Sequence, residues 1–596
     1  MDVSVRIFYP ELPAVAELVP HRAAYIGDAA GRCEVFAWDT RRQQARQLTN
    51  RPQGTVSCAI DPAGAEVWWF DDDLAGVGDW RTQPFGGGAD RLALPGVPAG
   101  RAAGLAMAAD GTVAAGIGEA GGLAVVVRRP TEPPRRIFRT TGYATLVDLT
   151  HDGDALVLAT EPAAADAVRL IDPAGREIAT LSGVDGPLWA LGFAPVPGPP
   201  VLLLAVQRDT DYRLATWTQA GGLSDVDWCG FDSEIAASWY PDGRRVLVRQ
   251  DRHARSLLHE VDLTAGTTRR VPTPPGSLLA AGVQPDGDLQ YVWTDSAHPP
   301  RLRTASGLRL PGPVDVAQPG RCQDLWVDGP AGRVHALLTV PDRPGPYPTV
   351  VLLHGGPYET ARDAYDPLVS VFVGTGCAVV RPNYRGSTGY GAAWRQASAD
   401  DGVGLTALAD IAAVRAELIR TGVARPGQIA VCGESWGGYL ALLAAGVQPE
   451  LWQAVAAVSP IADYAAAFAA ATPAVRALDR QLFGGTPDEL PARYAASSPI
   501  SYAAAVRAPV LLVAGTADEK CPPAQVQAYA DALADHGRAP DLVWVETGHQ
   551  GYDAAGRAEV LGTVVRAVCT ALGGKPETAP ASALAGRPPG TPAGAR

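Results

Sequence analysis

The strongest chemical signal in this sequence is a serine between two glycines. The stretch from 431 to 439 reads VCGESWGGY, so Gly433 and Gly437 lie two residues to either side of Ser435. An apolar strand pattern precedes the turn and an apolar helix pattern follows it, as a G-x-S-x-G nucleophile elbow requires. In such an elbow the serine occupies a strained turn, and the glycines prevent collisions with the neighbouring strand and helix. Ser435 is therefore a candidate nucleophile.

A serine hydroxyl becomes a good nucleophile when an imidazole accepts its proton and a carboxylate orients that imidazole. Downstream, the apolar strand in APVLLVAGTADEKCPP ends in a loop with Asp518, and the strand in DLVWVETGHQGY ends in a loop with His549. Both loops follow sheet strands, where the ligands of α/β sheets bind. The order serine, acid, histidine is that of the α/β hydrolases. Ser435, Asp518 and His549 are the predicted catalytic triad.

Two backbone amides are predicted to form the oxyanion hole. The amide of Trp436 begins a helix, where N–H groups lack intrahelical partners. HGGP at 354–357 follows another predicted strand and matches the HGG-type loop that supplies the second N–H. Gly356 is the predicted donor. Each of these patterns alone could be an ordinary turn, a helix cap or a solvated loop, but together they favour acyl transfer without a metal or an organic cofactor.

The C-terminal half shows the alternating strand and helix patterns of an α/β-hydrolase domain, which is expected over residues 319–572. Near-continuous apolar runs such as YPTVVLLHGGP and GCAVVRPNYRG are typical of strands buried on both faces of a parallel sheet. Helical patterns alternate with them, and two of these helices are expected to stop at Gly422 and Gly537. Residues 573–596 are rich in Pro, Ala and Gly, which predicts a disordered tail.

Residues 21–318, after an N-terminal segment of residues 1–20, are predicted to form an all-β propeller of seven blades. Tight turns recur every 40 to 50 residues, at Asp61, Asp110, Asp152, Asp242 and Asp286, with a looser turn near Gly198. Asp-Gly and related pairs favour the turns of antiparallel strands. A fixed period of this length indicates propeller blades. A pair of β-sandwiches could supply similar turns, but it would not repeat at this period.

Composition narrows the function further. The chain has 596 residues and a net charge of -13, which disfavours nucleic-acid and anionic-membrane partners. Its eight cysteines include no C-x-x-C pair, so reduced thiols without a metal are expected. The first residues lack a signal-peptide pattern, which favours a cytoplasmic location. A homo-oligomer is compatible with the sequence.

The sequence resembles the prolyl oligopeptidase family of serine peptidases, in its acylaminoacyl-peptidase and aminopeptidase-like branches. The phrases that carry the resemblance are HGGP, NYRGSTGYG (383–391), GESWGGY (433–439), SSPISY (497–502), GTADEKCPP (515–523) and GHQ (548–550). The resemblance implies that Ser435 is the nucleophile, Asp518 the acid and His549 the base. It also implies that the backbone amides of Gly356 and Trp436 are the oxyanion donors, and that a propeller forms the first domain.

The chain departs from the family pattern in three places. Glu434 and Trp436 flank the serine where the family often has other residues, which puts the rim of the substrate pocket in doubt. The stretch VGLTALAD lacks a Trp and an Asp common there and keeps Gly404 and Asp410. No Glu-Glu pair is present to hold a free amine as in the dipeptidyl peptidase branch; the run from Asp71 to Asp73 is either another amine anchor or a solvated blade turn.

The expected function is hydrolysis of short peptides, or of aminoacyl or acylaminoacyl amides, through an acyl-enzyme, with access limited by the propeller. Two alternatives stay open. The same chemistry serves an aminoacyl-amide natural product or an ester, and a binding scaffold could carry an inert hydrolase domain. The sequence leaves open the residue preference, exo or endo cleavage, and whether the substrate's N-terminus is free.

Overall fold

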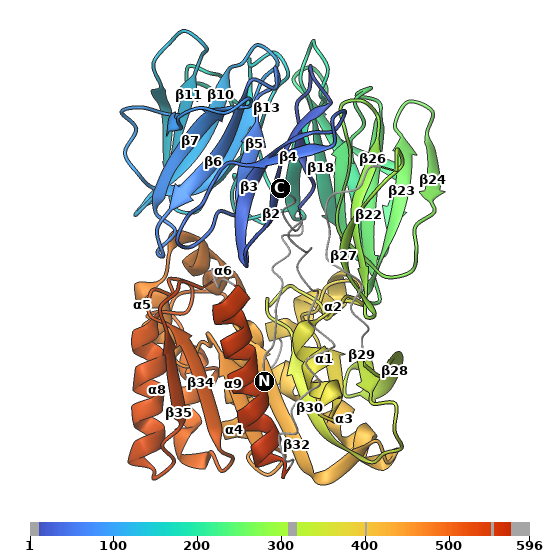
Figure 1. Cartoon of the computed structure of the whole chain (residues 1–596), viewed down its shortest axis with the longest axis vertical. Helices are drawn as coiled ribbons and strands as arrows, with labels where there is room; N and C mark the ends of the chain where they lie inside the picture. The colour runs from blue at the N-terminus through green and yellow to red at the C-terminus, as the bar shows by residue number, and fades with distance from the viewer. Residues whose placement is uncertain (1–10, 308–318, 400–401, 550–553, 574–596) are drawn as a thin grey trace, which may run out of the picture.

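The computed structural model describes residues 11–307, 319–399, 402–549 and 554–573, which form two stacked domains (Figure 1). The strands of the N-terminal half lie in the upper domain, and the helices and the large sheet of the C-terminal half lie below. The change of architecture falls between residues 304 and 321, around the predicted boundary at 318/319. The predicted tail lies outside the described residues, except for Gly573.

The N-terminal half is a seven-bladed β-propeller, as the turn period predicted. Each blade is an antiparallel sheet of consecutive strands, four in the first six blades and three, within the described residues, in the seventh. The first four blades comprise β1 (Ala14–Val15), β2 (Arg22–Ala29), β3 (Arg32–Asp39) and β4 (Gln44–Gln47); β5 (Cys58–Ile60), β6 (Glu66–Asp72), β7 (Gly78–Pro84) and β8 (Arg91–Leu92); β9 (Arg101–Met107), β10 (Val113–Glu119), β11 (Gly122–Arg128) and β12 (Arg135–Thr141); and β13 (Thr145–Leu149), β14 (Leu156–Ala159), β15 (Val168–Ile171) and β16 (Glu177–Leu181). The last three comprise β17 (Leu188–Phe193), β18 (Val201–Arg208), β19 (Asp211–Thr218) and β20 (Gly222–Phe231); β21 (Ile235–Trp239), β22 (Arg245–Arg252), β23 (Arg255–Asp262) and β24 (Thr267–Val271); and β25 (Ser277–Val283), β26 (Leu289–Asp295) and β27 (His298–Thr304).

The aspartates that mark the repeat lie between the first and second strands of their blades. Asp61 Oδ1 accepts the amide of Glu66 at 2.6 Å, and Asp242 Oδ1 accepts the amides of Arg244 and Arg245 at 2.9 Å. A carboxylate that accepts amides two or more residues ahead replaces the strand bonds that a turn leaves unmade. The repeat in the sequence is therefore a repeat of side-chain-capped turns.

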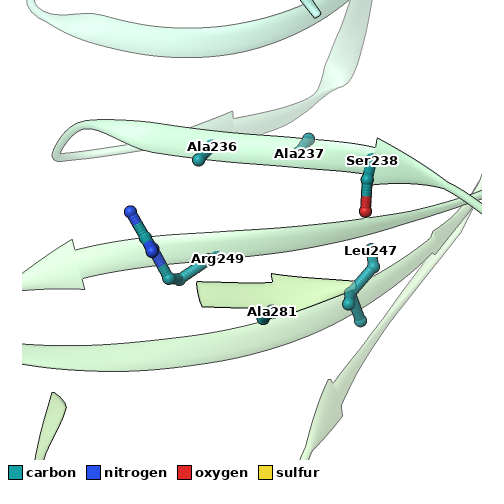
Figure 2. A pocket seen from close by; sticks show the side chains of 6 residues that line it. All are labelled: Ala236, Ala237, Ser238, Leu247, Arg249 and Ala281. Carbon is teal, nitrogen blue, oxygen red and sulfur yellow. The ribbon is translucent and has the colours of Figure 1, made fainter. Parts of the chain in front are cut away.

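Blades six and seven are joined by a polar contact next to a small cavity (Figure 2). Arg249 of β22 donates from Nη1 to the carbonyls of Leu278, at 3.0 Å, and Leu279, at 2.8 Å, both on β25. The cavity beside it has a volume of about 70 Å³, which is far below the roughly 300–1,000 Å³ of ligand sites. Arg249 therefore ties two blades together.

The C-terminal half is built on one eight-stranded sheet in the order β28-β29-β31-β30-β32-β33-β34-β35. The pairs β28–β29 and β29–β31 are antiparallel, and all the following pairs are parallel. The strands are β28 (Arg321–Gly329), β29 (Gly332–Val340), β30 (Tyr347–Leu353), β31 (Ala378–Asn383), β32 (Ala424–Glu434), β33 (Ala454–Val458), β34 (Val510–Gly515) and β35 (Asp541–Val545).

Helices cover both faces of this sheet, which explains the continuous apolar runs of the sequence. Along β30, Val351 packs into the larger core, while its neighbour Val350 packs into the second core on the opposite face. The larger core includes residues of α3 and α4, and the second includes residues of α1 and α9. The helices are α1 (Pro367–Gly374), α2 (Ala392–Gln396), α3 (Leu405–Arg420), α4 (Trp436–Val447), α5 (Tyr464–Ala470), α6 (Pro473–Phe483), α7 (Pro491–Ala496), α8 (Pro523–Asp535) and α9 (Ala554–Ala571), with 3-10 helices η1 (Ala397–Ala399) and η2 (Pro499–Ala505).

Two of these helices end close to where the sequence predicted. Gly422 and Gly537 follow α3 and α8 with φ angles of +72°, a conformation that glycine adopts without strain at a helix C-terminus.

Within the described residues, no helix combines the length and the apolar character that a membrane span needs.

One buried carboxylate in the C-terminal half lacks a compensating charge among the described residues. Asp479 of α6 is 3% exposed, and its Oδ2 receives no hydrogen bond from them. Burial raises the pKa of Asp479 to about 7. The folded chain thus keeps a proton that the unfolded chain, with a pKa of about 3.9 for Asp, has released. The contribution of Asp479 to the free energy of unfolding consequently falls as pH rises from about 4 to about 7.

Asp479→Asn should remove this pH dependence, because the amide stays neutral in both states. We expect the melting temperature of the variant, relative to wild type, to rise between about pH 5 and about pH 8. Thermal melts at both values of pH measure this difference. Asp488→Asn, at an exposed position after α6, is the matched control. If the melting temperature of Asp479→Asn differs from that of wild type by the same amount at both pH values, the raised pKa of Asp479 is contradicted.

Candidate active site

The turn around Ser435 joins β32 to α4 and has the strained geometry of a nucleophile elbow. Ser435 has φ +56° and ψ -120°, which a non-glycine residue rarely adopts. Its amide donates to the carbonyl of Val458 at 2.8 Å, so the neighbouring strand holds the turn in place. A Cβ at Gly433 would lie 2.3 Å from the carbonyl carbon of Gly437, and one at Gly437 would lie 2.2 Å from the carbonyl oxygen of Leu353. Both glycines are thus required sterically.

The structure brings Ser435, His549 and Asp518 together at one edge of the sheet. His549 Nε2 lies 3.2 Å from Ser435 Oγ, and His549 Nδ1 lies 2.8 Å from Asp518 Oδ2. Asp518 follows β34, His549 follows β35, and these two strands are parallel neighbours. This arrangement allows a proton to pass from the hydroxyl to an imidazole whose other nitrogen donates to a carboxylate.

The Asp518 side chain is fixed by its own loop. Its Oδ1 accepts the amides of Lys520 at 2.9 Å and Cys521 at 2.8 Å, and the side chain is almost wholly buried. Asp518 is thereby held as an acceptor that faces the imidazole.

The HGG loop lies against the elbow. A Cβ at Gly355 would be 3.9 Å from Ser435 Cβ and 3.6 Å from the carbonyl oxygen of Glu434. In the described part of the chain, the amides of Gly356 and Trp436 donate to no backbone carbonyl outside regular helices and strands. Amides without backbone acceptors are the kind of donor that an oxyanion hole requires, so Gly356 and Trp436 stay candidates for this role.

A buried network holds the HGG loop. His354 Nε2 lies 2.7 Å from Ser387 Oγ, and the His354 ring stacks on Tyr384 at 4.3 Å. Burial lowers the pKa of His354 to about 4, so its imidazole is neutral near pH 7. Next to Tyr384, the Arg385 guanidinium forms a buried ion pair with Asp410, with Nε 3.0 Å from Oδ2. Asp410, one of the residues that the altered VGLTALAD stretch keeps, therefore holds the segment of Tyr384 and Arg385 on which the His354 ring stacks.

One group of potential metal ligands occurs at the site within the described residues. The ligand atoms of Asp518, Cys521 and His549 lie within 4.8 Å of one another. Asp518 and His549 already bond to each other, and burial raises the pKa of the Cys521 thiol well above its usual value. A protonated thiol is a poor ligand because metals bind the thiolate. The geometry thus suits proton transfer better than metal binding.

The propeller touches the loops that carry Asp518 and His549. A Cβ at Gly548 would lie 2.4 Å from the carbonyl oxygen of Leu74, in the turn between β6 and β7. Arg101 Nε donates to Glu519 Oε2 at 2.7 Å, directly after Asp518. The Gly31 carbonyl accepts the amide of Ala554 at 2.7 Å, at the start of α9. Three propeller segments thus brace the loops on either side of the triad.

The sequence alone could not indicate these contacts. Leu74, Gly31 and Arg101 belong to ordinary blade turns and strands, and no local pattern distinguishes them from their equivalents in other blades. Cys521, whose side chain contacts Ser435, lies in the motif GTADEKCPP, but no feature of the sequence indicates a role for it. Gln550, the last residue of GHQ, lies outside the described residues.

The sequence profile of the prolyl oligopeptidase family matches residues 364–567. The hydrolase domain of this chain belongs to the prolyl oligopeptidase family. Curated relatives include acylamino-acid-releasing enzyme 2 of Oryza sativa subsp. japonica, 28% identical over 202 residues (32% of this chain and 26% of the relative), and the acylamino-acid-releasing enzyme of Sus scrofa, 28% identical over 373 residues (56% and 50%). The chain thus spans between about a quarter and a half of the length of these relatives.

Solved structures share the two-domain fold of this chain over nearly its whole length. A Mycobacterium tuberculosis puromycin-hydrolyzing peptidase superposes with a TM-score of 0.80 at 21% identity, covering 96% of each chain. An acylaminoacyl peptidase of Pyrococcus horikoshii superposes with a TM-score of 0.72 at 16% identity, covering 94% of this chain and 95% of its own. At these identities the likeness concerns the fold.

The contact at Gly548 generates a prediction. In Gly548→Ala the new methyl group would collide with the Leu74 carbonyl. The backbone at residue 548 would have to move, and His549 is the next residue. Because a misplacement of about 1 Å can cost about 100-fold in rate, we expect kcat to fall by about 10- to 100-fold. Steady-state kinetics on a peptide anilide measures this.

Gly374→Ala is the control for this substitution. Gly374 is exposed, and a Cβ there meets open space, so its variant should keep wild-type kcat. Unchanged kcat for Gly548→Ala would show that the propeller contact has no bearing on the histidine.

Proposed function

We propose that the protein is a serine peptidase that hydrolyses short peptides, or aminoacyl or acylaminoacyl amides, through an acyl-enzyme. The observation that carries this proposal is the pair of contacts at His549, 3.2 Å to Ser435 Oγ and 2.8 Å to Asp518 Oδ2. Family membership of the hydrolase domain supports it. So do the curated relatives, which are named as enzymes that release acylamino acids.

In the proposed reaction His549 accepts the proton of Ser435 as the hydroxyl attacks the substrate carbonyl. The tetrahedral oxyanion accepts hydrogen bonds from the amides of Gly356 and Trp436. The imidazolium, oriented by Asp518, then protonates the leaving amine. Water, deprotonated by the same histidine, releases the acyl group and restores the hydroxyl. Each step uses groups of this chain, the substrate and water.

Ser435→Ala tests the nucleophile. We expect kcat to fall by about four to six orders of magnitude, by comparison with other triads, with little change in folding because only a hydroxyl is lost. Labelling by a fluorophosphonate probe should disappear in parallel. Ser224→Ala, at an exposed position of the propeller, should retain both labelling and rate. Near-normal turnover by purified Ser435→Ala would refute the nucleophile, and absence of labelling in wild type would favour an inert scaffold.

The position of the propeller supports restricted access. It covers the side of the sheet at which the triad loops lie (Figure 1), and it contacts those loops through Leu74 and Arg101. A cover in this position would hinder a folded protein from reaching Ser435, whereas an extended peptide of a few residues could pass it. Propeller-gated access to short substrates is therefore part of the proposal.

Substrate size tests the gating directly. A tetrapeptide anilide should be cleaved with a kcat/KM at least about 100-fold above that for intact casein, because chain unfolding and domain displacement precede any contact with Ser435. Assays at equal concentration of scissile bonds, with gel analysis of casein, give the ratio. Equal rates on the two substrates would exclude gating by the propeller.

A second candidate substrate is the amide of an amino acid with a non-peptide amine. Two solved structures that share the fold are described as a puromycin-hydrolyzing peptidase and a puromycin hydrolase. The same acyl chemistry serves peptides, such amides and esters, so a panel of all three separates them. The cytoplasmic location and the oligomeric state stay predictions from the sequence.

A further inference from the structure

The segment of residues 383–391, between β31 and α2, is bound to the propeller. The amide of Gly389 donates to Glu234 Oε2 at 2.7 Å, and the carbonyl of Gly389 accepts the amide of His253 at 3.0 Å. Ala392, the first residue of α2, packs into a hydrophobic core whose other buried members all belong to the propeller. The start of α2 is therefore fixed to the facing blades of the propeller (Figure 1).

The same segment also holds the chain that directly follows the HGG loop. The amide of Thr388 donates to the carbonyl of Glu359 at 2.9 Å. The buried Asn383 side chain accepts the amide of Ala361 on its Oδ1 at 2.7 Å. Residues 358–361 thus lie on a support that is itself bound to the propeller.

Arg395, on the next turn of α2, lies between aromatic rings of the two domains. Its Cζ is 4.2 Å from the centroid of the Tyr358 ring in the hydrolase domain and 5.8 Å from that of Trp189 on β17 of the propeller. A guanidinium within about 6 Å of a ring centroid is attracted to the face of the ring. Arg395 therefore links blade five to the second residue after Gly356.

The propeller also fixes the guanidinium by a hydrogen bond. Tyr212 of β19 bonds to the Arg395 side chain, and the Tyr212 hydroxyl in turn donates to Glu234 Oε1 at 3.0 Å. No carboxylate of the described residues forms an ion pair with Arg395. The position of its charge thus depends on the two rings and on Tyr212, and two of these three partners belong to the propeller.

Tyr358 and Gly356 are too tightly coupled to move separately. Gly356 has φ +128°, and a Cβ there would lie 2.8 Å from the Tyr358 amide nitrogen, so the chain turns sharply between the two residues. An oxyanion donor is effective only when its N–H is about 2.7–3.1 Å from the place that the oxyanion will occupy. A displacement of the Tyr358 ring would therefore misdirect the Gly356 amide.

We propose that Arg395 is a positioning residue of the oxyanion hole. By stacking between Trp189 and Tyr358, it directs the Gly356 amide toward the substrate oxyanion. This inference rests on the proposed peptidase function and gives the propeller a part in the chemical step, in addition to restricting access.

Arg395→Gln removes the cation and keeps a polar side chain. We expect kcat on a peptide anilide to fall by about 10- to 100-fold with little change in KM, because outright loss of one oxyanion donor costs about 100- to 1,000-fold and a misdirected donor costs less. Arg395→Lys, which keeps a cation beside the rings, should recover part of the rate. Steady-state kinetics measures both effects.

A pair of inhibitors separates an oxyanion defect from a general loss of structure. With a peptide aldehyde, Ser435 Oγ adds to the carbonyl carbon, the hydroxyl proton passes to His549, and the carbonyl oxygen becomes an oxyanion that faces Gly356. The inhibition constant of the aldehyde should rise in Arg395→Gln by about the factor by which kcat/KM falls. The corresponding peptide alcohol cannot add to the serine and should bind as in wild type. The acid limb of the kcat/KM profile, which reports His549, should not move.

Arg415→Gln is the matched control, because Arg415 of α3 also stacks on a ring, that of Trp452 at 5.9 Å, away from the HGG loop. It should keep wild-type kcat and aldehyde affinity. Melting temperatures verify folding, and Trp189→Leu, which removes the propeller ring instead, replaces Arg395→Gln if the latter does not fold.

Wild-type kcat and aldehyde affinity in Arg395→Gln would overturn the proposal, and so would an equal loss of affinity for the aldehyde and the alcohol. In both cases turnover by wild type upholds the peptidase function. Wild type that hydrolyses no peptide and resists the fluorophosphonate probe would overturn both.

Discussion

The hydrogen bond from His549 Nδ1 to the Asp518 carboxylate is the contact on which the rest of the site depends. A histidine without it can present either ring nitrogen to the serine, and only one tautomer accepts a proton from Ser435. The contact exists because β34 and β35 are parallel neighbours, so that the loops after them leave the same edge of the sheet. The buried surroundings strengthen it, since the effective dielectric constant there is lower than in water.

The propeller acts on this contact through three of its segments. Leu74 abuts the residue before His549, Arg101 binds the residue after Asp518, and Gly31 holds the start of α9. The Arg101–Glu519 pair is partly exposed, at 35% and 27%, and such pairs contribute about 0–1 kcal/mol each. Less exposed polar contacts also join the domains, such as the ion pair at 2.9 Å between Arg362 Nη1 and Asp251 Oδ2. The contacts beside Asp518 and His549 are thus one part of a wider polar interface.

The fold was predictable from the sequence because its signals are local. The capped turns at Asp61 and Asp242 repeat with the blades, and the apolar runs of the second half become strands buried on both faces. Ser435, Asp518 and His549 could be proposed together because each follows a recognisable strand. The contacts between the domains could not, since they join ordinary residues from distant parts of the chain. Asp410 is a similar case. The sequence shows only that this residue of the family pattern is kept, whereas the packing reveals its ion pair with Arg385.

The run from Asp71 to Asp73 shows why charge patterns alone cannot settle function. Successive side chains of a strand point to opposite faces, and the strand ends within this run, so three identical residues enter three environments. Asp71 pairs with Arg51, Asp73 caps its own turn, and Asp72 lines a cavity at the domain interface. The role of each carboxylate thus follows from its packing and not from its residue type.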